Sequence, residues 1–158
     1  MTTTHTPGVM KRFGRAAWRF QETFETPLHD IDRFVSTIAS AHGNIQKASI
    51  VIDQVVFDTE HLNALVSADA SPIQLARDFS ITTGSPHEVE PLLRAAFADW
   101  IDFLFVPTPK PFVIYADHDE FVTFCANTKS HINQIVKPLT SHRYSVVQNW
   151  KRDRKSVV

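Results

Sequence analysis

The sequence predicts an α+β fold in which two split strand–helix–strand units form a four-stranded, mainly antiparallel sheet. Two observations carry this prediction. Residues 18–57 show an alternating strand pattern, a helix pattern and a β-branched strand pattern, and residues 112–150 show an apolar strand pattern, a helix pattern and an alternating strand pattern. Between them, three helix patterns at about residues 58–106 indicate a helical insert.

The first unit begins with residues 18–25, where aromatic and polar side chains alternate as in a strand with one buried face. Glu22 interrupts the apolar face, which favours a position at the sheet edge. Thr26-Pro27 predicts a helix start, with Thr as the N-cap and Pro in the first helical position, and residues 42–44 supply its end. Residues 48–57 are apolar on both faces, which is typical of a covered central strand.

The insert is predicted to hold three helices. The sequence places them from Asp58 or Thr59 to about Ser67, from Ser71-Pro72 to Phe79, and after the capping box Ser85-x-x-Glu88. The apolar positions of residues 92–105 cover more than half of a helix circumference, so we expect this helix to be buried on more than one side.

The second unit begins with a buried strand at residues 112–116. A capping box, Asp117-x-x-Glu120, then predicts a long helix over about residues 118–137, which Pro138 ends. Residues 144–150 alternate as a last strand.

Without the insert, this element order is that of the ferredoxin-like arrangement, in which both long helices cover one face of the sheet. The other face then needs a cover, because residues 48–57 are apolar on both sides. The helix at residues 92–105 or a partner molecule could supply it.

Composition predicts one domain without cofactor-binding loops. The 158 residues are 43% hydrophobic and 21% charged, with a net charge of −1, and we divide them into a flexible arm (1–15), a single domain (16–151) and a charged tail (152–158). Four glycines and neither phosphate-binding glycine motif indicate no nucleotide cofactor. The single cysteine and the lack of a long apolar run favour a cytoplasmic protein without a membrane segment.

The sharpest polar feature is the cluster Asp117, His118, Asp119 and Glu120, which follows a buried strand. Carboxylates with a histidine can bind a divalent cation or carry out acid–base chemistry. Acidic residues at a helix start also cap the helix and favour its dipole, and we prefer this interpretation.

Two residues within the predicted strands, Asp53 and Tyr115, complete the candidate ligand-binding set. Asp53 interrupts a β-branched strand, and a carboxylate there needs a partner, for which Tyr115 or Arg19 is suitably placed.

Cys125 lies on the apolar stripe of the helix predicted at residues 118–137, which indicates a core residue and not a nucleophile.

Basic residues gather near both ends of the chain. They are Lys11, Arg12 and Arg15 in the arm and Lys151, Arg152, Arg154 and Lys155 in the tail. These residues could form one phosphate-binding patch if the ends meet, but we favour solvated termini because the net charge is close to zero.

The sequence therefore favours a non-catalytic binding or interaction protein: an adaptor, an inhibitor or immunity-type protein, or an assembly subunit. It would bind a protein partner or a second copy through a sheet face or the helical insert. The alternative is a small enzyme or a ligand- or metal-binding domain with a polar site around Asp117–Glu120. A nucleic-acid partner is disfavoured, because no strand combines stacking aromatics with basic residues.

Overall fold

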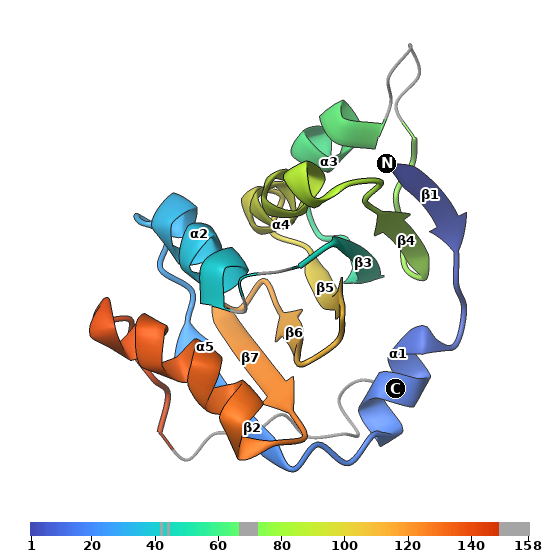
Figure 1. The fold of residues 1–158 in the computed structure, drawn as a ribbon. Helices are drawn as coiled ribbons and strands as arrows, with labels where there is room; N and C mark the ends of the chain where they lie inside the picture. The colour runs from blue at the N-terminus through green and yellow to red at the C-terminus, as the bar shows by residue number, and fades with distance from the viewer. Residues whose placement is uncertain (42, 44, 67–72, 149–158) are drawn as a thin grey trace.

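The computed structural model describes residues 1–41, 43, 45–66 and 73–148. These residues form one antiparallel sheet of seven strands in the order β1-β4-β3-β5-β6-β7-β2, together with five α-helices (Figure 1). The strands are β1 (Thr2–His5), β2 (Phe20–Glu25), β3 (Lys47–Gln54), β4 (Phe79–Thr82), β5 (Asp102–Thr108), β6 (Val113–Ala116) and β7 (Phe121–Ala126). The helices are α1 (Val9–Arg15), α2 (Ile31–Ala41), α3 (Glu60–Val66), α4 (Val89–Ala98) and α5 (Lys129–Ser141), and a 3-10 turn spans Pro86–Glu88.

The prediction of a four-stranded ferredoxin-like sheet with a three-helix insert was wrong. The supposed insert contains two strands, β4 and β5, and both pair with β3 in the middle of the sheet. The sheet therefore runs through the region that the sequence analysis assigned to helices alone.

Strand β5 was read as the second half of a long helix. Helix α4 in fact ends at Ala98, and Trp100 then turns the chain with a φ of 54°. Because β5 lies between β3 and β6 and is buried on both faces, its apolar run lacks the alternation that marks a strand. A run of this kind cannot be distinguished from a buried helix by its period.

Strand β7 was read as the first half of the second long helix. It instead forms a hairpin with β6, and on its other side it pairs with β2. Helix α5 begins only after Thr128, whose Oγ1 accepts a hydrogen bond from the His131 amide at 3.1 Å. Pro138 lies inside α5 and does not end it.

Several other predictions were confirmed. Strand β2 forms one edge of the sheet and β3 lies inside it, while β6 and α3 occupy the expected segments. Helix α2 also forms, although it begins at Ile31 and not directly after Thr26-Pro27. Residue 146 makes only an isolated bridge to Phe24, where a last strand was expected.

Three predictions fall wholly or partly outside the described residues. They concern His42 and Asn44 at the end of the first long helix, Ser71-Pro72 at a helix start, and residues 149–158, with the end of the last strand and the charged tail. The described part of the second insert helix, residues 73–79, contains no helix and leads into β4.

The main core lies between the sheet and helices α2, α4 and α5, which cover one face (Figure 1). Phe34 of α2 is fully buried at its centre, and its ring contacts three others edge-on: Phe97, Phe124 and Tyr144, with ring centroids 5.1–6.4 Å away. None of the described helices is long and apolar enough to cross a bilayer.

The opposite face of the sheet is covered by α1, in the segment expected to be a flexible arm. Met10 and Phe13 of α1 pack on a small second core of sheet residues: Val51, Leu104, Val113, Tyr115 and Cys125. The helix predicted at residues 92–105 therefore does not cover this face. Toward the two sheet edges the same face carries hydroxyl pairs, the part-buried Ser49–Thr82 at 2.8 Å and the fully buried Thr23–Thr123 at 2.9 Å, in which each hydroxyl has a hydrogen-bond partner.

Candidate functional site

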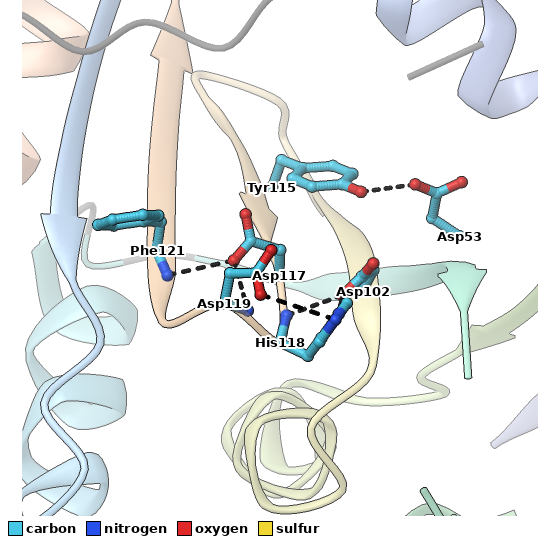
Figure 2. Close-up of polar contacts among 7 residues, drawn as sticks. All are labelled: Asp53, Asp102, Tyr115, Asp117, His118, Asp119 and Phe121. Carbon is cyan, nitrogen blue, oxygen red and sulfur yellow. Dashed lines mark hydrogen bonds and ion pairs between the residues drawn. The ribbon is translucent and has the colours of Figure 1, made fainter. Parts of the chain in front are cut away.

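The candidate site lies at one end of the α1-covered face, where β3, β5 and the β6–β7 hairpin come together (Figure 2). Asp53 sits at an irregularity of β3, where the pairing with β5 shifts between Ile52 and Gln54. Bulges of this kind re-aim side chains and are frequent beside functional sites.

Asp53 and Tyr115 are hydrogen-bonded across β5. The Tyr115 hydroxyl donates to Asp53 Oδ2 at 2.5 Å, and Arg77 Nη2 lies 3.7 Å from the other carboxylate oxygen. The Asp53 side chain is only 13% exposed, so these partners offset the cost of burying its charge. The expectation that Tyr115 or Arg19 would pair with Asp53 was thus correct for Tyr115.

Asp117 shapes the hairpin turn and does not begin a helix. Its Oδ1 accepts hydrogen bonds from the amides of Asp119 at 2.9 Å and Phe121 at 3.3 Å. This is the side-chain-to-backbone pattern of an Asx turn. Glu120 completes the turn in the left-handed region with a φ of 75°, and its carbonyl accepts from the Thr26 amide at 2.8 Å.

His118 is held by a buried carboxylate that the sequence analysis missed. Asp102 Oδ1 accepts from both the backbone amide and Nδ1 of His118, each at 2.7 Å (Figure 2). This hydrogen bond raises the pKa of His118 above its ordinary value, against the opposing effect of burial. Asp119 Oδ1 lies 3.8 Å from Nε2 and adds a smaller effect in the same direction.

A second aspartate–histidine pair repeats this geometry nearby in the sequence. Asp99 Oδ1 accepts from the amide and Nδ1 of His61, at 3.1 and 2.8 Å, and its Oδ2 accepts from the Leu62 amide at 2.8 Å. Asp99 is buried and satisfies amides at the start of α3. Asp99 and Asp102 were overlooked because a continuous helix at residues 92–105 gave them no special position.

The six predicted site residues thus fall into two groups. Asp53 and Tyr115 share a hydrogen bond. Asp117, His118 and Asp119 lie together in the β6–β7 turn, where Asp117 accepts from the Asp119 amide and His118 Nε2 lies 3.8 Å from Asp119 Oδ1, and Glu120 contributes backbone to the same turn. Within the described residues, no three His, Cys, Asp or Glu side chains are placed to hold a metal ion. The arrangement orders a sheet end and raises the pKa of His118 through its hydrogen bond to Asp102.

A different surface feature lies at the end of β3. The loop at residues 55–59 exposes Val56 and Phe57, which are 42% and 60% accessible. Beside the loop is an open groove of about 570 Å³, lined by Val55, Phe57, Asp58, Thr59, Glu60, Asn63, Ile73, Gln74 and Leu75. The groove thus combines apolar side chains with two carboxylates.

Comparison of the chain with family models, with curated proteins and with solved structures found no match. A functional assignment therefore rests on the geometry of these two surfaces.

Proposed function

We propose that this chain is a non-catalytic interaction protein, and that its binding surface is the Val56–Phe57 loop with the adjoining groove. The observation that carries the proposal is the 60% exposure of Phe57 beside an open groove with apolar and acidic lining. Most of this surface lies within residues 58–106, the segment that was predicted to be a helical insert and a possible binding region.

The energetics favour a covered state of this loop. Complete burial of a Phe side chain stabilises a complex by roughly 1.5–3 kcal/mol, and aromatic residues dominate the binding energy of many protein interfaces. The large hydrophobic residues found exposed in the described chain are Leu28, Val56 and Phe57, and two of the three are neighbours in this loop. Single exposed hydrophobic residues are common on protein surfaces, whereas adjacent ones form a patch that often marks an interaction site.

The charge of the groove indicates the partner's chemistry. Asp58 and Glu60 lie on its lining and form no ion pair with any described residue. A partner segment with a Lys or Arg beside an apolar side chain would complement both the carboxylates and the apolar floor. We place this interaction in the cytoplasm, because the one cysteine, Cys125, is a buried free thiol.

The polar cluster supports a non-catalytic role. Its carboxylates are engaged in holding the fold: Asp53 with Tyr115, Asp102 with His118, and Asp117 with its own turn. These bonds give each side chain a structural purpose that requires no substrate.

Photocrosslinking in the native cell tests the proposal. Phe57 would be replaced by photoreactive p-benzoylphenylalanine, and Thr140, which is exposed on α5, would be replaced in a matched control. We expect a discrete protein adduct at position 57 that is absent at position 140 and that decreases when Asp58→Lys and Glu60→Lys are added. The absence of any adduct specific to position 57 would contradict the proposal.

A second candidate function is ligand or metal binding around Asp117–Glu120. The observation in its favour is His118, which has its Nδ1 fixed by Asp102 and its Nε2 close to Asp119. Thermal shift assays with Zn²⁺, Mn²⁺ and Mg²⁺ test it: a cation that binds there raises the Tm of the wild type but not of His118→Gln. If no cation raises the wild-type Tm, the metal hypothesis is excluded.

A further inference from the structure

The charges of this chain are strongly segregated. Residues 1–21 contain Lys11, Arg12, Arg15 and Arg19 but none of the seventeen acidic residues, so the remaining chain carries a net charge of −5. In the structure all four cationic side chains are exposed on or just after α1. Lys110 adds to them, because its Nζ lies 6.0 Å from the ring of Trp18, which itself packs beside Phe13.

We refer to Lys11, Arg12, Arg15, Arg19 and Lys110 together as the basic α1 surface. Among the described residues, no carboxylate forms an ion pair with Lys11, Arg12, Arg19 or Lys110. Ala17 and the partly exposed Trp18 lie between these cations, so the surface also offers apolar area. It therefore has the chemistry that the acidic groove at the Val56–Phe57 loop requires.

One copy of the chain cannot bring its own two surfaces together. Helix α1 packs on the sheet face that carries the small core, whereas α3, which begins beside the groove, packs against α4 on the other face. Figure 1 shows α1 and α3 well apart, with β1 and β4 near α3 and α1 farther along that side. The complementary charges can meet only between different copies.

We infer that the chain self-associates, with the Val56–Phe57 loop and acidic groove of one copy docked on the basic α1 surface of a second copy. Asp58 and Glu60 face Lys11 and Arg12 across this contact, and Phe57 is covered by the apolar area around Trp18. The inference rests on the proposed function, because it identifies the partner of that same surface. The contact joins two unlike surfaces, so the number of copies depends on whether their rotation closes a ring.

Sedimentation velocity over a range of protein concentrations tests the inference on the wild-type chain. We expect the mass to increase with concentration at low ionic strength, and the association constant to fall about tenfold or more at about 0.5 M salt, since exposed charges are screened. The double variants Asp58→Lys/Glu60→Lys and Lys11→Glu/Arg12→Glu should each lose association by about tenfold or more.

Mixing the two double variants provides the decisive measurement. The reversed groove of one then complements the reversed α1 surface of the other, so an equimolar mixture should recover association that neither variant shows alone. Controls with equal charge changes elsewhere, Glu25→Lys/Asp32→Lys and Lys129→Glu/Lys137→Glu, should associate as the wild type does.

A wild type that remains monomeric at every concentration and salt, or a mixture without recovery, would overturn the inference. The photocrosslinking experiment separates this failure from failure of the proposed function. An adduct of position 57 with a different protein leaves the interaction surface established and removes the second copy as its partner, whereas the absence of any adduct removes both.

Discussion

Asp102 and His118 are joined twice through a single oxygen atom: Asp102 Oδ1 lies 2.7 Å from both the amide nitrogen and Nδ1 of His118. The contact connects the start of β5 to the turn between β6 and β7. Because Asp102 is almost fully buried and the His118 ring only partly so, the pair links the protonation of one histidine to the order of the hairpin.

This pair should make stability dependent on pH. The pKa of His118 is raised in the folded protein, so its contribution is fully present below its unfolded pKa of about 6.5 and is lost as pH rises through the folded value. The difference in unfolding free energy between wild type and His118→Gln should therefore shrink from pH 5.5 to pH 8. Urea denaturation at several pH values measures it. NMR titration should show a larger fall in the His118 pKa for Asp102→Asn than for Asp119→Asn, since the Asp102 hydrogen bond is the main cause.

The turn role of Asp117 predicts different effects for two substitutions. Asp117→Asn keeps an acceptor for the amides of Asp119 and Phe121 and should change stability little. Asp117→Ala removes both bonds and should cost about 1–2 kcal/mol. Chemical denaturation measures both. Equal losses for the two variants would show that the negative charge, and not the acceptor, is what the turn needs.

Tyr115→Phe should destabilise the fold by leaving the Asp53 carboxylate without its closest donor. Hydrogen bonds to charged groups contribute about 1.5–3 kcal/mol, and Arg77 at 3.7 Å replaces only part of this one. The double variant Tyr115→Phe/Asp53→Asn should lose less than the sum of its two single changes. Strict additivity in this cycle would mean that the two side chains are not coupled.

The aromatic cluster around Phe34 should be the most sensitive part of the main core. Phe34→Ala removes a fully buried ring and should cost about 3–5 kcal/mol. Phe57→Ala, at a site that is 60% exposed, should stay within about 0.5 kcal/mol of the wild type. Thermal and urea unfolding of both variants provide the comparison, and similar losses at the two positions would be inconsistent with the described burial.

Helix α1 should protect the thiol of Cys125. Cys125 is 1% exposed in the small core that Met10 and Phe13 cover, so Phe13→Ala should accelerate its reaction with a thiol reagent under native conditions. Lys11→Ala, on the outer side of the same helix, should leave the rate unchanged. An unchanged rate in Phe13→Ala would show that Cys125 is shielded by something other than this contact.

The sequence allowed prediction of those elements in which local pattern and burial agree. Strand β2 was expected at a sheet edge, and β3, which is apolar on both faces, was expected in the centre; both positions were confirmed. Strands β5 and β7 were misread because two-sided burial removes the alternation and because, unlike β3 with its run Ile50–Ile52, they have no long β-branched run to mark a strand.

The candidate site was predicted only where its residues lie in elements that the sequence identifies. Tyr115 and Asp53 were paired correctly because both lie in strands that were identified. Asp99 and Asp102 reach their histidine partners only because α4 ends at Ala98 and the chain turns at Trp100. No local sequence signal marks this helix end, so neither aspartate could be predicted as a site residue. The acidic Asp117-x-x-Glu120 spacing fits an Asx turn as well as a helix cap, and only the pairing of β6 with β7 decides between them.

The order of the strands has a consequence for how the chain folds as it is synthesised. Both edges of the sheet, β1 and β2, precede every other strand, yet β1 pairs with β4 and β2 pairs with β7. Thr4 meets Ser80, and Phe24 meets Val122, so neither edge can dock until long stretches of later chain have emerged from the ribosome. Pairings this distant fold slowly. The segment that supplies α1 and both sheet edges is therefore the part of the nascent chain that stays unpaired longest, and unpaired strand edges of this kind favour aggregation.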